Sequence, residues 1–143
     1  MPEIFIGTDI VSVPKIKEII DSPTGEKFIK RIFTENEINY CKGKLNSLQH
    51  YAGRFAAKEA ITKAVLSSEN IPSIKMNSIE IVSGENRRPE VNLIEEYDFE
   101  YKCKVSISHT AENAIAFAIF ESVPLSESPS LSNTIKDKEQ AVI

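Results

Sequence analysis

The chain has 143 residues and a mass of 16.0 kDa, which fits one domain with a sizeable hydrophobic core. Hydrophobic residues make up 41 % of the chain and charged residues 27 %, a composition that excludes a mainly disordered or collagenous protein. The 17 Lys and Arg residues against 21 Asp and Glu residues give a net charge of −4, without the basic excess of a dedicated nucleic-acid binder.

Helices are expected mainly in the first half of the chain and strands in the second. Runs of β-branched and aromatic side chains predict the strands, and apolar residues at helical spacing predict the helices. Thr34 and Glu37 form the pattern of a capping box, which marks a helix start. In chain order we expect a strand over 3–11, helices over 14–21, 26–31, 35–43 and 47–66, and strands over 78–83, 90–95, 102–109 and 114–121.

This order of elements predicts an α+β fold rather than alternating βαβ units. Residues 1–121 are expected to form the folded domain. Residues 122–143 are rich in Ser and carry interspersed charges, so we expect them to form a flexible tail.

The cysteines and the apolar pattern bear on the location of the protein. Cys41 and Cys103 are too few for a disulfide framework, and no CxxC motif indicates a metal knuckle. No apolar run approaches the ~20 residues of a membrane-spanning helix, and the first residues lack the basic start of a signal peptide. We therefore expect a cytoplasmic protein with reduced thiols.

Asp9 lies in the first expected strand, although aspartate is a poor strand former. Strand alternation places it on the same face as Phe5, Gly7 and Val11. Two interpretations remain open. Asp9 could cap the helix that begins near Pro14, or it could be a carboxylate placed there for chemistry.

A face of small residues runs along the helix expected over 47–66. With residues placed about 100° apart, this face contains Ala52, Gly53, Ala56, Ala57, Ala60 and Ala64. Glu59 lies at its edge, and a partly buried carboxylate needs a cation, a metal or a proton. A pair with Lys63, one turn later, is the simpler interpretation and stays open.

His109 is the third residue that departs from its local pattern. It shares strand parity with Val105 and Ile107, whereas Ser106 and Ser108 face the other way. A histidine on an apolar face is either a hydrogen-bonded core residue or a functional one.

The motifs that are absent narrow the chemistry. The chain contains no GxxxxGK[ST], GxGxxG, HExxH or GxSxG motif. The chemistry that remains is the binding of a metal ion by carboxylate oxygens, one from a strand and one from a helix. Arg54, Lys58 and Lys63 lie nearby in the sequence. Mg²⁺ takes one or two carboxylates together with water and substrate phosphates, so the pattern indicates a Mg²⁺–phosphate site.

Four segments resemble the signature blocks of holo-acyl-carrier-protein synthase, the small trimeric type of 4′-phosphopantetheinyl transferase. They read Gly-Thr-Asp-Ile at 7–10, Arg-Ile-Phe-Thr-Glu-Asn-Glu at 31–37, Ala-Gly-Arg-Phe-Ala-Ala-Lys-Glu-Ala-Ile-Thr-Lys-Ala at 52–64 and Val-Ser-Ile-Ser-His-Thr at 105–110. Their order and spacing match over residues 3–121, and the third block is the most specific.

The resemblance implies a fold, a reaction and an assembly. The fold is an antiparallel-rich sheet packed on one long helix and several short ones. The reaction moves the phosphopantetheine arm of coenzyme A onto a serine of acyl carrier protein, in fatty-acid biosynthesis, and releases adenosine 3′,5′-bisphosphate. The assembly is a homotrimer with active sites between subunits.

The resemblance also implies roles for individual residues. Asp9 and Glu59 would be the Mg²⁺ ligands, and Lys63 would contact the pyrophosphate. The positions expected to bind coenzyme A are Arg54, Lys58, Arg88 and His109.

Three departures from the family pattern stand out. Lys15 replaces an arginine of the helix expected to dock the carrier protein, and Ser-Ser-Glu-Asn-Ile-Pro at 67–72 replaces a glycine-rich stretch. Arg87 stands where the family commonly has glycine before a Lys-Pro pair, which should disfavour a turn with positive φ.

The charge distribution gives a separate indication. Between Pro14 and Lys63 there are ten basic and six acidic residues, a local charge of +4 in a chain of net charge −4. This asymmetry suits phosphates and an acidic partner. A non-catalytic α+β module that binds an acidic protein therefore remains the alternative function, and a nucleotide-binding regulator fits less well without a glycine-rich loop.

Overall fold

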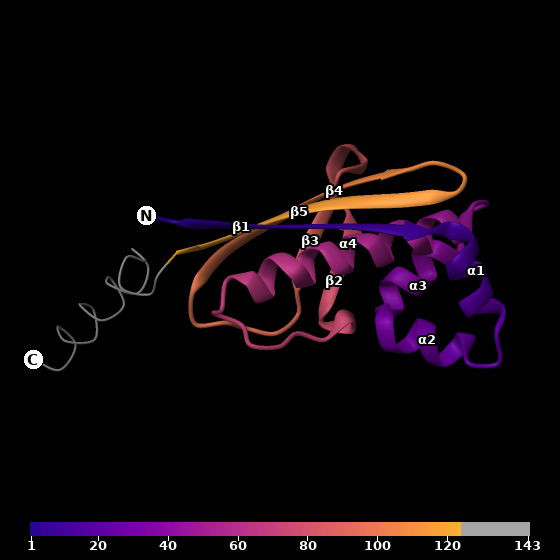
Figure 1. Cartoon of the computed structure of the whole chain (residues 1–143), viewed down its shortest axis with the longest axis horizontal. Coiled ribbons are helices and arrows are strands. Elements are labelled where there is room, and N and C mark those ends of the chain that lie inside the picture. The colour runs from indigo at the N-terminus through magenta and orange to yellow at the C-terminus, as the bar shows by residue number, and fades with distance from the viewer. Residues whose placement is uncertain (124–143) are drawn as a thin grey trace, which may run out of the picture.

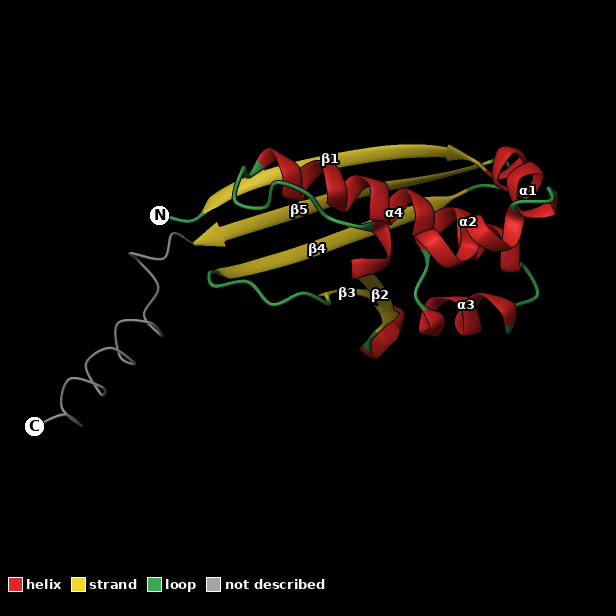
Figure 2. Ribbon diagram, turned by 90° about the horizontal axis from the view of Figure 1, so that it is seen from below, coloured by secondary structure: helices red, strands yellow, loops and turns green. Residues whose placement is uncertain are grey.

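A three-stranded antiparallel sheet lies against one long helix, and this pair of layers forms the body of the protein (Figures 1 and 2). The computed structural model describes residues 1–123. The strand order is β1 (Glu3–Ser12), β5 (Asn113–Val123) and β4 (Glu100–His109), so β5 lies in the middle. The helix is α4 (Ser47–Ser67).

The smaller elements surround this body. A separate antiparallel pair consists of β2 (Ile79–Ser83) and β3 (Pro89–Leu93). The helices α1 (Val13–Asp21), α2 (Gly25–Ile32) and α3 (Glu35–Lys42) form a group at one end of α4, as Figure 1 shows. Two short 3₁₀ turns complete the described chain, at Met76–Ser78 and Glu85–Arg87. The predicted α+β fold and each expected element are confirmed.

The predicted small-residue face of α4 packs on the sheet. Its alanines at 52, 56, 57, 60 and 64 are completely buried, and α4 packs against β1 and β5, whose alanines at 114, 116 and 118 are also buried. Gly7 of β1 makes the closest approach, because a Cβ atom added there would lie 1.9 Å from the carbonyl oxygen of Ala60. Small side chains on both layers therefore bring the backbones of β1 and α4 unusually close.

Alternation along β1 and β5 leaves the other face of the sheet apolar and exposed. The residues concerned are between 37 % and 66 % exposed, and they are Ile4, Ile6, Ile10, Ile115, Phe117 and Ile119. Isolated exposed apolar residues are ordinary, but a contiguous patch of this kind marks an interaction surface.

The helix starts follow the local sequence. Ser12 caps α1, with its hydroxyl oxygen accepting from the backbone N–H of Lys15 at 3.4 Å, and a proline lies in the first turn. The predicted capping box of α3 is confirmed, since Thr34 Oγ1 accepts from the N–H of Glu37 and the Glu37 carboxylate accepts from the N–H of Thr34.

The end of the described chain lies slightly beyond the expected domain boundary. Ser122 and Val123, expected in the tail, are the last two residues of β5, and Ser122 is buried. The rest of the expected tail, 124–143, lies outside the described residues. Among residues 1–123, no helix combines the length and apolar character needed to cross a membrane.

Candidate active site

Asp9, Glu59 and Lys63 meet where β1 approaches α4. Asp9 lies on the inner face of β1, on the same side as Gly7, and its side chain is 19 % exposed. Lys63 Nζ donates to Asp9 Oδ1 at 3.2 Å and to the carbonyl oxygen of Thr8 at 3.0 Å. The lysine thereby links the helix to the strand beside the carboxylate.

Glu59 interacts electrostatically with both Asp9 and Lys63. Burial raises the pKa of its carboxyl group, the charge of Asp9 raises it further, and Lys63 opposes both effects. The carboxyl group of Glu59 is thus held near the carboxylate of Asp9, with the cation of Lys63 beside them. Such a pair is poised to accept a divalent cation, which would relieve the repulsion.

The donor set fits Mg²⁺. Asp9 and Glu59 supply carboxylate oxygens, and Mg²⁺ is commonly bound by one or two carboxylates together with substrate phosphates. Within residues 1–123 no group of three or more His, Cys, Asp and Glu residues forms a closed metal cage. The pair therefore resembles an open site that a phosphate group would complete.

Both simpler interpretations of these carboxylates are wrong. Asp9 does not cap α1, because Ser12 does. Lys63 forms its ion pair with Asp9 of the neighbouring strand rather than with Glu59 on its own helix.

A second cluster lines a cavity of about 210 Å³ near the first half of α4. Arg54 and His109, two of the residues expected to bind coenzyme A, both line it. Arg54 is 7 % exposed, and its Nε atom is buried without a hydrogen-bond partner among the described residues. A buried guanidinium with an unused donor indicates a place for an anionic acceptor.

The aromatic ring of Tyr40 supports this arginine. The guanidinium carbon of Arg54 lies 3.9 Å from the centre of the Tyr40 ring, which is a cation–π contact. A hydrogen bond to Ser83 lowers the pKa of Tyr40, and the charge of Arg54 lowers it further against the effect of burial. The stack restricts the position of Arg54 at the cavity wall.

Histidine residues line the same cavity. His109 is exposed at the end of β4, so it is not a core histidine, although it keeps the predicted strand parity with Ile107. His50 of α4 also lines the cavity, and its pKa is lowered by burial and then by the charges of Arg54, Lys44 and His109. The cavity therefore gathers nitrogen-bearing side chains from Arg54, His50 and His109.

Arg87 and Arg88 lie in the turn between β2 and β3. Arg87 lines the cavity that contains Arg54, whereas Arg88 lines a neighbouring cavity of about 690 Å³. Arg87 has a φ of 60° and follows Asn86, with a φ of 58°. The turn therefore keeps its positive φ without the glycine, and it does so with an arginine in the strained left-handed region, in line with the expectation that this turn is disfavoured.

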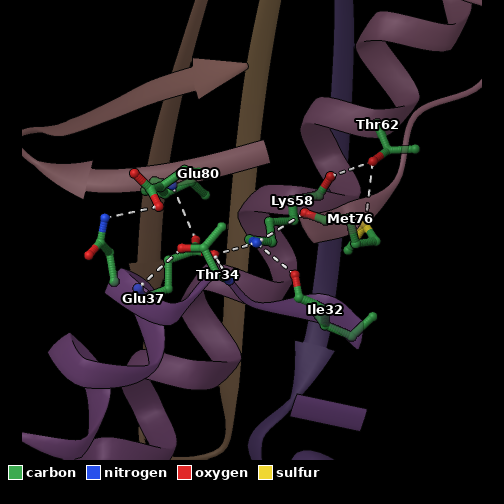
Figure 3. Close-up of polar contacts among 9 residues, drawn as sticks. Ile32, Thr34, Glu37, Lys58, Thr62, Met76 and Glu80 are labelled. Carbon is green, nitrogen blue, oxygen red and sulfur yellow. Dashed lines mark hydrogen bonds and ion pairs between the residues drawn. The ribbon is translucent and has the colours of Figure 1, made fainter. Parts of the chain in front are cut away.

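Lys58 does not lie in either cluster. Its side chain is 0 % exposed and its ammonium group forms an ion pair with Glu37, which is equally buried (Figure 3). The ammonium group also donates to the backbone carbonyl oxygens of Ile32 and Met76, so it has no exposed surface on which to meet a ligand. We therefore leave Lys58 out of the proposed ligand-binding residues.

The sequence did not single out Tyr40 and His50. His50 lies one helical turn before Arg54, so helical spacing could have placed it on the same face. Tyr40 carried no such signal, because it lies on a different helix and meets Arg54 only through the packing of α3 against α4.

Comparison with known proteins identifies the family of the chain. The family model of the 4′-phosphopantetheinyl transferase superfamily matches residues 5–119. A holo-[acyl-carrier-protein] synthase of Cytophaga hutchinsonii is 39 % identical over 80 % of this chain and 94 % of its own length. The corresponding protein of Clostridium beijerinckii is 42 % identical over 84 % of this chain and 98 % of its own.

A solved structure shares the fold. The holo-(acyl-carrier-protein) synthase of Bacillus anthracis, in complex with CoA (3′,5′-ADP), is 33 % identical and superposes with a TM-score of 0.66. The match covers 83 % of this chain and 96 % of that one. The chain therefore belongs to the holo-acyl-carrier-protein synthase family within the 4′-phosphopantetheinyl transferase superfamily.

Proposed function

We propose that the chain transfers the 4′-phosphopantetheine group of coenzyme A to a serine of apo acyl carrier protein, with Asp9, Glu59 and Lys63 at the reacting pyrophosphate. The observation that carries the proposal is the meeting of these three side chains at the contact between β1 and α4. Family membership supports the reaction. The pairing of two carboxylates with a lysine supports the location of the site at the contact between β1 and α4.

The reaction needs little covalent chemistry from the chain itself. The serine hydroxyl of the partner attacks the phosphorus that carries the pantetheine arm, and a new P–O bond forms. The P–O bond to adenosine 3′,5′-bisphosphate breaks, this bisphosphate leaves, and the serine proton is released to water. No serine nucleophile is required of this chain, which agrees with the absence of a nucleophile motif.

Lys63 would stabilise the charge that develops on the leaving phosphate. Its side chain is 55 % exposed, and its ammonium group is held beside Asp9 by two bonds to β1. A compact positive charge fixed near a developing negative one lowers the barrier most when little rearrangement is needed. The bonds to Thr8 and Asp9 provide that fixed position.

We propose Mg²⁺ as the cofactor, held by Asp9 and Glu59. When bound, the ion would polarise the pyrophosphate and neutralise charge on the leaving group. The raised pKa of Glu59 supports this assignment, since a group that is costly to ionise alone becomes stable beside a cation.

Arg54 and His109 would hold the remaining phosphate of coenzyme A in the 210 Å³ cavity. Arg54 and Glu59 are five residues apart on α4, which is ~7.5 Å along a helix axis. We include Arg88 of the adjoining cavity in the same binding region.

We further propose that copies of this chain cover the exposed apolar face of β1 and β5, in the homotrimer implied by the family. The six exposed apolar residues on one sheet face support an interface between copies. A cytoplasmic location, the partner acyl carrier protein and the domain boundary near 121 are part of the same proposal.

The test is the intact mass of an apo acyl carrier protein after incubation with this protein, coenzyme A and Mg²⁺. A mass gain of one phosphopantetheine arm, lost when EDTA is added, supports the proposal. Asp9→Asn and Glu59→Gln should each abolish the gain while the protein remains folded. Glu3→Gln, an exposed carboxylate at the other end of the same strand, is the matched control and should retain the gain.

The same experiment separates the transferase from the alternative function. No mass gain with several carrier proteins, together with binding of an acidic carrier protein by the folded chain, would favour a non-catalytic binding module. Mass gain that survives EDTA would refute the metal assignment alone.

A further inference from the structure

Lys58 and Glu37 form an enclosed charge pair that the proposed reaction does not use. Lys58 Nζ donates to the carbonyl oxygen of Ile32 at 2.7 Å and to that of Met76 at 3.0 Å, and it forms an ion pair with Glu37 Oε1. An ammonium group has three donors. Each of the three therefore has a partner, as Figure 3 shows.

Glu37 is held as firmly as its partner. Its Oε1 atom accepts from the N–H of Thr34 at 2.9 Å, and its Oε2 atom accepts from the N–H of Ile81 at 3.1 Å. The pair thereby joins the middle of α4 to the end of α2, the start of α3, the turn at Met76–Ser78 and β2.

A second contact between α3 and α4 lies one helical turn away. Arg54 precedes Lys58 by four residues on α4, and Tyr40 follows Glu37 by three residues on α3, so each pair shares a helix face. The two helices are thus joined first by the enclosed ion pair and next by the stack of Arg54 on Tyr40. Only the second contact reaches the cavity.

We propose that Glu37 and Lys58 are positioning residues for coenzyme A binding: they fix α3 against α4 so that the Tyr40 ring holds the Arg54 guanidinium in the cavity. The inference rests on the proposed function, and it concerns how the binding site is kept in shape. Arg54 is the residue that would touch the ligand. Glu37 and Lys58 act on it through Tyr40.

The energetic reason is the rigidity of a fully bonded buried pair. Burial lowers the pKa of Lys58, and the charge and hydrogen bond of Glu37 oppose this effect. If Glu37 is replaced by glutamine, the ammonium group loses its counter-charge, and the N–H of either Thr34 or Ile81 loses its acceptor because an amide has a single oxygen. Tyr40, in the last turn of α3, would then shift relative to Arg54.

The test is a double-mutant cycle on the Michaelis constant for coenzyme A. Glu37→Gln and Tyr40→Leu should each raise that constant about tenfold, the loss expected when one charge-assisted contact to a phosphate weakens. Because both changes act through Arg54, the double variant should be no worse than the more affected single variant. The kcat per folded molecule should stay within about twofold of the wild type.

A purely structural role predicts a different result. Loss of stability alone reduces the amount of folded enzyme, which lowers the apparent kcat and leaves the Michaelis constant unchanged. The proposal is overturned if Glu37→Gln lowers the apparent kcat and leaves the Michaelis constant unchanged. It is also overturned if the double variant raises the Michaelis constant by the product of the effects of Glu37→Gln and Tyr40→Leu. Glu80→Gln is the matched control, since its carboxylate acts on Lys58 without bonding to it, and it should leave the constant unchanged.

A substitute variant and a binding measurement keep the result of this experiment interpretable. If Glu37→Gln does not fold, Glu37→Asp takes its place in the cycle, because it keeps the charge and shortens the side chain. Calorimetric titration with adenosine 3′,5′-bisphosphate measures binding without the reaction. If the wild type and the Glu37 variant bind this ligand equally tightly, the positioning role alone is overturned. If the wild type does not bind it, the proposed function is overturned as well.

Discussion

Replacing Gly7 by alanine should damage both stability and activity, because no space exists for the added methyl group. Its Cβ atom would lie 1.9 Å from the carbonyl oxygen of Ala60 and 2.9 Å from the backbone nitrogen of Ala64. A carbon and an oxygen atom approach to about 3.3 Å at the closest. The strand must therefore retreat from α4 by roughly 1.4 Å.

The retreat carries an energetic and a catalytic cost. Overpacking of this kind destabilises a protein by about 1–3 kcal/mol, which corresponds to a decrease in Tm of about 4–12 °C for a domain of this size. Asp9 lies two residues further on the same face of β1 and moves with it. A displacement of ~1 Å between reacting groups can reduce kcat about 100-fold.

Thermal unfolding and steady-state transfer with excess Mg²⁺ measure the two effects. Gly43→Ala provides the control, since an added Cβ atom at that helix end would meet its nearest neighbours at an ordinary 3.6 Å. The reasoning fails if Gly7→Ala keeps the Tm and the activity of the wild type, or if Gly43→Ala is equally harmful.

Three further predictions concern other parts of the molecule. Phe117→Lys on the exposed apolar face should shift the protein from a trimer to a monomer in light scattering after size exclusion, and an unchanged mass would contradict the proposed interface. Arg87→Gly should raise the Tm by a few degrees in thermal unfolding, because glycine removes a left-handed strain of about 1 kcal/mol. Burial raises the pKa of Cys41 from 9.0 to about 11. The folded thiol should therefore resist alkylation at pH 8 but react in denaturant, and its contribution to stability should be complete below pH 9 and lost as the pH rises through about 11.

Local patterns in the sequence were sufficient to predict the layers of the fold. The alternation in β1 predicted that Asp9 and Gly7 share a face, and the spacing of small residues in α4 predicted a close contact with another element. Both predictions are confirmed because they follow from the geometry of a single strand or helix. The capping box at Thr34 is a local pattern of the same kind.

These local patterns could not predict which side chains make contacts between different helices and strands. Nothing local distinguishes Lys58, which is enclosed, from Lys63, which is exposed at the site, although both lie in the same sequence block. Their difference comes from what packs against each side of α4, with α3 on one side and β1 on the other. The stack of Arg54 on Tyr40 depends on the same packing and could not be predicted.

The pairing of β1 with β5 sets the time at which the site can form during synthesis. Within the described chain β1 has no other strand partner, and Thr8 Oγ1 donates to the carbonyl oxygen of Ala116 across 108 positions of sequence. A contact of such high sequence separation must overcome a large loop-closure entropy and forms slowly. The helices can fold on the ribosome before β5 emerges, whereas Asp9 can be fixed beside Glu59 only afterwards. Until then β1 is an unpaired strand with exposed isoleucines, which is a liability for aggregation of the nascent chain.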